Sequence, residues 1–191
     1  MHDTKRRLLE AGLMMLLERG YHGLGVQDLL DRTGVPKGSF YHHFESKEDL
    51  ALQAVDLYAA LAHAQLEASL SAEERPPLER VRDFFDQIRK MYASEGYLGC
   101  FLGALGQELS GMNDVFRRRI ESCFASLAGG LGECLEEARQ AGDIPRDTDA
   151  QQFATVLIQA WEGAALRSRL VRSAVPLDSF FEFYFRPVAR W

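Results

Sequence analysis

Apolar residues recur at helical spacing along almost the whole chain. No segment shows sustained apolar–polar alternation with β-branched residues, the pattern that would indicate a strand. The breaks at glycine and proline predict an all-α protein of about nine helices. The expected helices are residues 3–19, two short ones within 26–44, then 47–70, 78–92, 100–109, 113–140, 148–172 and 177–190.

The two short helices within residues 26–44 are joined by a tight turn. Gly34 suits the left-handed backbone that ends one helix, and Pro36 presets the backbone of the first turn of the next. This arrangement predicts a helix-turn-helix. Gly25 and Pro36 supply no side-chain cap, so we expect slightly frayed helix starts.

The second short helix carries two stripes, because residues four apart share a helix face. Phe40 and Phe44 form an apolar stripe sized for a small core. The other stripe offers a cation, a glycine, a phenol and an imidazole, all suited to phosphates and base edges in a major groove. Its members are Lys37, Gly38, Tyr41 and His42.

Residues 34–50 read GVPKGSFYHHFESKEDL, which resembles the signature of TetR-type transcriptional regulators. The resemblance implies a three-helix DNA-binding domain over residues 1–46 and a helical effector-binding and dimerisation domain over 47–191. It also implies a set of residues that face DNA, whereas Phe40 and Phe44 are structural. The set is Gln27, Lys37, Gly38, Ser39, Tyr41, His42 and Lys47.

The net charge of −6 does not favour nucleic-acid binding, since phosphates are neutralised by Lys and Arg. Its distribution weakens that objection. Residues 1–50 carry 7 Lys or Arg and 8 Asp or Glu, so only −1 of the total lies there. We expect modest nonspecific affinity, with the acidic remainder limiting binding to random DNA.

The last two helices have more apolar surface than one core needs to cover. A second subunit is the simplest cover; docking of the last helix entirely within its own chain is the alternative. The resemblance implies a homodimer through these helices, which fits a pseudo-palindromic operator of double-stranded DNA. The expected interface residues are Phe153, Leu157, Ala160, Ala164, Phe180, Phe181 and Tyr184.

The middle of the chain, residues 57–161, is expected to bind a small-molecule effector of unknown identity. Each candidate wall residue also suits a plain hydrophobic core. The candidates are Phe84, Ile88, Met91, Tyr92, Cys100, Leu105, Phe124 and Trp161, with Gln107, Glu108 or Gln159 as polar selectors.

Cys100 follows Gly99 at an expected helix start, where backbone N–H groups stabilise a thiolate. Residues 97–103, YLGCFLG, are similar to the subgroup of NemR-like and acrylate-responsive regulators. That resemblance implies that Cys100 senses electrophiles or oxidants or lines the effector pocket. The alternative is a small residue that packs a helix end. Cys123 and Cys134 have core-compatible spacing and are expected to be inert.

These features together predict a cytoplasmic transcriptional regulator, most simply a repressor released from its operator by an effector. We expect no enzyme, because no convergent set of catalytic groups is apparent, and no metal or other cofactor. No membrane span or secretion signal is indicated. A scaffold that had abandoned DNA would be expected to lose Lys37, Tyr41 or Lys47, and all three are present.

Overall fold

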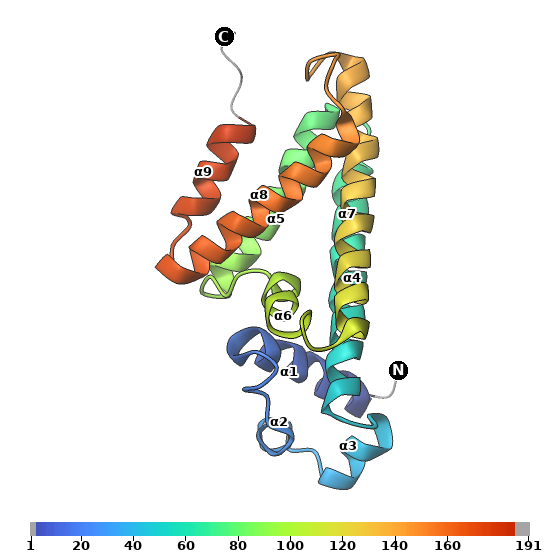
Figure 1. The fold of residues 1–191 in the computed structure, drawn as a ribbon, viewed down its shortest axis with the longest axis vertical. Coiled ribbons are helices and arrows are strands. Elements are labelled where there is room, and N and C mark those ends of the chain that lie inside the picture. Colours follow the sequence, from blue (N-terminus) through green and yellow to red (C-terminus); the bar gives the residue numbers. More distant parts are fainter. Residues whose placement is uncertain (1–2, 186–191) are drawn as a thin grey trace. The chain divides into compact units, whose positions relative to one another are not determined.

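The computed structural model describes residues 3–185, and within them the protein consists of nine helices and no strand (Figure 1). The predicted all-α class is therefore confirmed. The helices are α1 (Asp3–Arg19), α2 (Val26–Thr33), α3 (Lys37–His43), α4 (Lys47–Leu70), α5 (Pro77–Ser94), α6 (Phe101–Leu109), α7 (Asp114–Ala141), α8 (Ala150–Val171) and α9 (Val175–Tyr184).

Two helix ends differ from the sequence-based expectation. The N-cap of α8 is Asp149, whose carboxylate accepts the Gln152 N–H at 2.9 Å, so the helix begins at Ala150 and not at residue 148 as expected. The last helix was expected over 177–190; α9 already begins at Val175, because Pro176 fits the first helical turn. The expected continuation to Arg190 lies outside the described residues.

The described chain divides into two compact units. The first comprises residues 3–61 and 100–121, and the second comprises residues 62–99 and 122–185. The first unit therefore contains α6, the start of α7 and the larger part of α4 besides α1–α3. The functional division expected at residue 46 stays a prediction, since packing units need not coincide with functional domains.

The core of the first unit is built around α1, α2 and α3. Phe40 and Phe44 are almost completely buried, and their ring centroids lie 5.4 Å apart. Leu8 of α1 and Leu29 of α2 are also fully buried in this unit. Burying a side chain of this size contributes about 1.5–3 kcal/mol, so α3, a seven-residue helix, depends on these two rings for its position.

Close helix approach in the second unit explains two of the glycines within α7. A Cβ at Gly130 would lie 2.8 Å from a methyl carbon of Leu66 on α4, and one at Gly132 would clash with the Gln151 side chain on α8. A Cβ at Gly129 would meet no atom within 4 Å. Two of these three glycines therefore lie where another helix approaches α7 closely.

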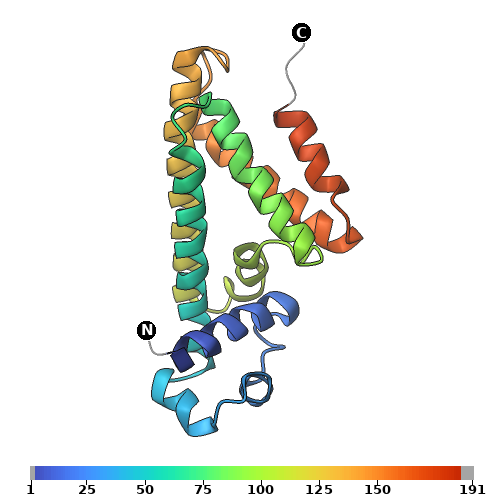
Figure 2. The ribbon, with the colours of Figure 1, turned by 180° about the vertical axis from the view of Figure 1, so that it is seen from behind.

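The helices α8 and α9 run in opposite directions and are joined by a short turn (Figures 1 and 2). An aromatic cluster links them to α5: the Trp161 ring lies 5.2 Å from Phe85 and 5.1 Å from Phe180, centroid to centroid. Over the described part of the chain, no helix is both long and apolar enough to cross a membrane.

Candidate nucleic-acid interface

The turn between α2 and α3 has the geometry expected from its sequence. Gly34 ends α2 in the left-handed region, with φ 64° and ψ 23°. Pro36 precedes α3 with φ −60°, and its carbonyl accepts the Ser39 N–H at 2.9 Å. Gly25 and Pro36 provide no side-chain cap, as expected. A helix-turn-helix is thus confirmed as local structure.

One face of α3 is open to solvent. Lys37, Gly38, Tyr41 and His42 are exposed, and the Tyr41 side chain keeps 54 % of its surface accessible. A Cβ at Gly38 would meet no atom within 4 Å, so another molecule's backbone can approach there. The polar stripe therefore lies outward while Phe40 and Phe44 anchor the helix from behind.

The Tyr41 phenol is positioned by the ring that anchors α3. The Phe40 and Tyr41 rings meet edge to face with centroids 5.1 Å apart. Because Phe40 is fully buried, this contact restricts the orientation of the exposed phenol. A rigid donor loses less entropy on contact with a base or phosphate than a mobile one.

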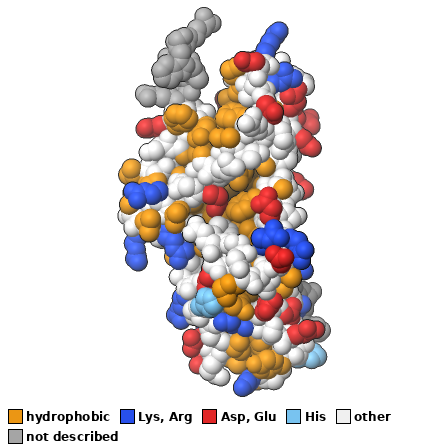
Figure 3. Space-filling model, viewed as in Figure 1, with side chains coloured by type: hydrophobic (Ala, Val, Ile, Leu, Met, Phe, Trp, Pro, Cys, Tyr) orange, Lys and Arg blue, Asp and Glu red, His pale blue; other side chains and the backbone are white. Residues whose placement is uncertain are grey.

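The remaining residues of the predicted DNA-binding set have varied surroundings. Gln27 is exposed at the start of α2 and donates to the Asp31 carboxylate at 2.9 Å. Ser39 is half-buried. On the side of this region visible in Figure 3, Lys, Arg, Asp and Glu side chains are interspersed, in accord with its near-neutral charge.

Lys47, at the start of α4, has partners within the fold. Its ammonium group donates to the carbonyls of Tyr21 at 3.0 Å and Leu24 at 3.1 Å, and it lies 4.4 Å from the Tyr21 ring centroid. An ammonium has three N–H groups, so these two bonds leave a third. Lys47 therefore holds the α1–α2 loop in place, and its contact with a phosphate stays a prediction.

Glu108 on α6 binds the same loop from another side. Its carboxylate accepts the backbone N–H groups of Tyr21 at 2.7 Å and His22 at 2.8 Å. Gly20 bends the chain there with φ 74°, and a Cβ on it would lie 2.6 Å from the carboxylate. Sequence reasoning considered Glu108 only as a selector in an effector pocket. Its partners lie 86 and 87 residues away, and no local pattern indicates such a distant pairing.

Replacing Glu108 by Ala is expected to lower the free energy of unfolding by about 2–3 kcal/mol, because two N–H groups lose a charged acceptor. Glu108→Gln keeps a neutral acceptor oxygen and is expected to lose roughly half as much. Urea denaturation of both variants measures the difference. Stabilities equal to that of the parent protein would show that the carboxylate does not hold the loop.

The predicted effector-pocket residues do not share one unit. Cys100 and Leu105 belong to the first unit; the other six belong to the second. Within the second unit, Phe84, Tyr92 and Trp161 are at least 97 % buried, and the Tyr92 and Trp161 rings lie 5.9 Å apart, centroid to centroid. Ile88, Phe124 and Met91 are more accessible. A role of this set in effector binding stays a prediction.

The predicted dimer-interface residues are mostly covered by their own chain. Leu157 is fully buried and Phe180 is 5 % exposed. Phe153, Ala160, Ala164, Phe181 and Tyr184 are half-buried. The exposed apolar side chains of α8 and α9 are instead Val156, Leu166, Leu170, Val171, Val175 and Phe183.

Two family models match the chain. Residues 8–54 match the bacterial regulatory proteins of the tetR family, and residues 77–184 match the tetracyclin repressor-like C-terminal domain. The first match covers the helix-turn-helix described above. The second covers most of the unit that contains α5, α8 and α9.

Individual relatives extend over nearly the whole chain. The transcriptional repressor DhaR of Mycobacterium sp. (strain GP1) is 34% identical over 95% of this chain and 90% of its own. The crystal structure of a regulatory protein TetR from Rhodobacter sphaeroides has a TM-score of 0.90 at 33% identity, covering 94% of this chain and 95% of its own. The reduced form of Escherichia coli NemR has a TM-score of 0.85 at 29% identity, covering 98% of both chains.

The sequence match, the shared fold and the exposed polar stripe of α3 lead to one assignment. Members of the matched family are DNA-binding regulators rather than enzymes. The chain belongs to the TetR family of transcriptional regulators and carries its helix-turn-helix in residues 26–43.

Proposed function

We propose that the protein is a dimeric repressor that binds a pseudo-palindromic operator through α3 and is released by a small-molecule effector. The observation that carries this proposal is the division of α3 into a buried pair of phenylalanines and an exposed stripe of Lys37, Tyr41 and His42. Donors on an exposed helix, held rigidly from behind, suit insertion into a major groove. The protein acts in the cytoplasm, where its operator DNA lies.

Selection of binding sites from a random pool of duplex DNA tests the proposal. We expect enrichment of one motif with two inverted half-sites, because a two-fold dimer presents two α3 helices. Binding of the selected motif should fall steeply as salt rises, since phosphate contacts release counterions. Recovery of no motif, or of one without internal symmetry, would contradict the dimeric repressor.

Dimerisation through α8 and α9 is supported by their exposed apolar surface. Val156, Gly163 and Leu170 recur at intervals of seven residues on α8, with Leu166 between the last two. Gly163 has open space at its Cβ position, which allows close approach of another helix. This face is better exposed than the set expected from the sequence, so we propose it as the centre of the interface.

Leu170→Asp is expected to convert the dimer to a monomer, because the leucine is 66 % exposed in the single chain and a carboxylate in an apolar interface must be desolvated. Sedimentation velocity measures the change. The matched control is Leu61→Asp on α4, where the parent leucine is 58 % exposed. Equal sedimentation of both variants and the parent would argue against this interface.

Effector and DNA prefer different conformations in this proposal, so each weakens the binding of the other by the same factor.

A second candidate function is a thiol sensor in which an electrophile modifies Cys100. Cys100 is half-buried at the N-cap of α6, where its sulfur accepts the Gly103 N–H at 3.5 Å. The same helix carries Glu108, so a change at the start of α6 has a direct route to the α1–α2 loop.

Iodoacetamide at pH 8 is expected to alkylate Cys100 before the other two cysteines. Burial raises the pKa of the Cys123 thiol to about 11, and it also raises the pKa of Cys134. A thiol with a pKa of 11 is only about 0.1 % thiolate at pH 8, and the thiolate is the reactive form. Mass spectrometry of the peptides measures the order, with Cys100→Ser as the control. Faster labelling of Cys123 would contradict this order.

A further inference from the structure

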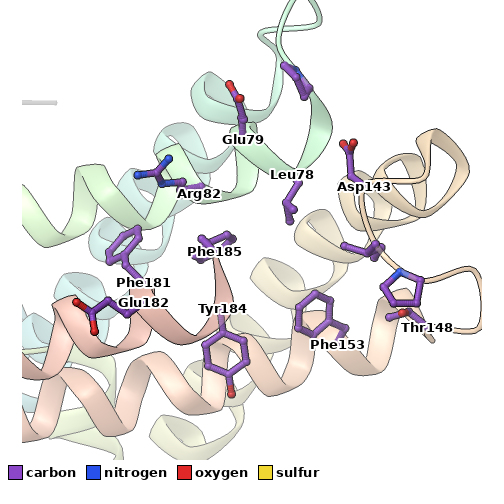
Figure 4. Close-up of a pocket in the computed structure, with 13 residues that line it drawn as sticks. Leu78, Glu79, Arg82, Asp143, Thr148, Phe153, Phe181, Glu182, Tyr184 and Phe185 are labelled. Atoms are coloured by element: carbon purple, nitrogen blue, oxygen red, sulfur yellow. The ribbon is translucent and has the colours of Figure 1, made fainter. Parts of the chain in front are cut away.

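The second unit contains a cavity of about 1010 Å³, whose lining includes Phe153, Phe181 and Tyr184 of the dimer-interface set expected from the sequence. It lies among the first turns of α5, the α7–α8 loop, the start of α8 and the end of α9 (Figure 4). The close-up shows Leu78 and the rings of Phe153 and Phe185 around its centre. Phe181 and Tyr184 complete the aromatic lining. The inner surface is therefore mainly apolar, with a volume near the upper end of small-molecule sites.

The charged residues of the cavity lie on its rim and are mostly acidic. Glu79, Asp143 and Glu182 are exposed carboxylates, and among the described lining residues Arg82 is the single cation. Their side chains point outward around the apolar centre in Figure 4. The described part of the lining thus carries a net charge of −2.

A neighbouring arginine does not cancel this negative charge. Arg75 pairs with Glu79 at 3.0 Å, and it also pairs with Asp83, which lies outside the lining. Adding both Arg75 and Asp83 to the group leaves the balance at −2. The rim therefore favours a ligand with a positively charged end over one with a negatively charged end, when that end stays in solvent.

On α8 the lining residue Phe153 is a neighbour of Val156 in the proposed dimer face, whereas on α9 the lining rings and the exposed apolar residue Phe183 lie on different sides. Residues two positions apart on a helix project about 200° apart. Phe183, which is 79 % exposed, therefore lies on the side of α9 opposite Phe181 and Phe185. A second copy that covers Phe183 does not need to fill the cavity.

We propose that this cavity binds an amphiphilic organic cation: an aromatic or alkyl body enters among the phenylalanine and tyrosine rings, and an ammonium group remains at the acidic rim. Aromatic faces also attract a cation that approaches them. Binding itself does not require DNA. Only its role as an effector rests on the proposed function.

A set of three small probes, matched in size but different in charge, tests the proposal on the full chain without DNA. The probes are 4-phenylbutylammonium, the neutral 4-phenylbutanol and the anion 5-phenylpentanoate. Ligand-observed NMR titration gives each dissociation constant at low salt. We expect the cation to bind at least about tenfold more tightly than the anion, and the difference to shrink as salt screens the rim. Equal affinities, or no binding, would overturn the proposal.

Two kinds of variant locate the site. Asp143→Lys combined with Glu182→Lys changes two exposed residues and is expected to reverse the preference between cation and anion. The control, Glu67→Lys combined with Glu121→Lys, makes the same change of net charge at exposed positions outside the lining and should keep the preference. Leu78→Trp places an indole ring at the apolar centre, narrows the cavity there and should weaken binding of all three probes. Unchanged binding in the first variant would place the probes elsewhere.

A chain that ends at Phe185 is titrated in parallel, because residues 186–191 directly follow this lining residue. Equal affinity of the full and the shortened chain supports the site. Binding by the shortened chain alone would overturn it as a site of the complete protein. Operator affinity is measured separately. Failure of the cation to bind would overturn this proposal, whereas failure of the operator to bind would overturn the proposed function.

Discussion

Replacing both Lys37 and Tyr41 by alanine is expected to weaken operator binding by at least about 30-fold. Each residue offers a donor to base edges or phosphates, and contacts of this kind contribute about 1–3 kcal/mol each. The sum of about 2–6 kcal/mol corresponds to a loss of between about 30-fold and 10⁴-fold. Fluorescence anisotropy with a selected operator measures the loss.

The double variant should fold normally, because Lys37 and Tyr41 are exposed and the anchoring rings of Phe40 and Phe44 remain. A thermal melt followed by circular dichroism checks this. The control is Arg118→Ala, which removes an exposed cation from α7 in the same unit. Operator affinity equal to that of the parent in the double variant would remove α3 as the recognition helix.

Replacing Lys47 by methionine is expected to have two effects that can be measured independently. Methionine keeps most of the apolar stem and leaves the carbonyls of Tyr21 and Leu24 without their charged donor. Hydrogen bonds to a charged group contribute about 1.5–3 kcal/mol, so the free energy of unfolding should fall by about 2–3 kcal/mol. Lys90→Met, which removes a surface ion pair with Asp86, is the control and should change stability by less than about 0.5 kcal/mol.

The salt dependence of operator binding reports on the third N–H of Lys47. If this third N–H contacts a phosphate, as the sequence predicts, Lys47→Met should reduce the magnitude of the slope of log affinity against log salt by about 0.9 per bound half-site. An unchanged slope with reduced stability would limit Lys47 to holding the α1–α2 loop. Unchanged stability would contradict the two hydrogen bonds to that loop.

The local features of this fold could be predicted from the sequence because their causes are local. Gly34 and Pro36 define the turn through their own backbone preferences, and the spacing of Phe40 and Phe44 defines the buried side of α3. The start of α7 is also local in origin, because the Asn113 side chain accepts the Val115 N–H at 2.8 Å. These interactions join residues within one or two helical turns.

The remaining features depend on residues far apart in the sequence. Glu108 reaches the loop after α1 only because the fold brings α6 there. The dimer-interface expectation relied on helical spacing, which identifies an apolar face without telling what covers it. In this structure, Phe180 of α9 packs against Phe85 of α5 and Trp161 of α8 and is 5 % exposed, so other residues of α8 and α9 form the exposed apolar surface. The exact start of α8 could not be predicted either, because Thr148 and Asp149 are adjacent and both are good N-cap residues.

Hydroxyl-radical footprinting of the selected operator tests the central proposal most directly. A dimer with two α3 helices should protect two short patches on one face of the duplex, with centres about 10–10.5 bp or a multiple of that apart. The variant carrying Lys37→Ala and Tyr41→Ala should leave both patches open to cleavage at the same protein concentration. A single patch, or equal protection by this variant, would contradict recognition by a pair of α3 helices.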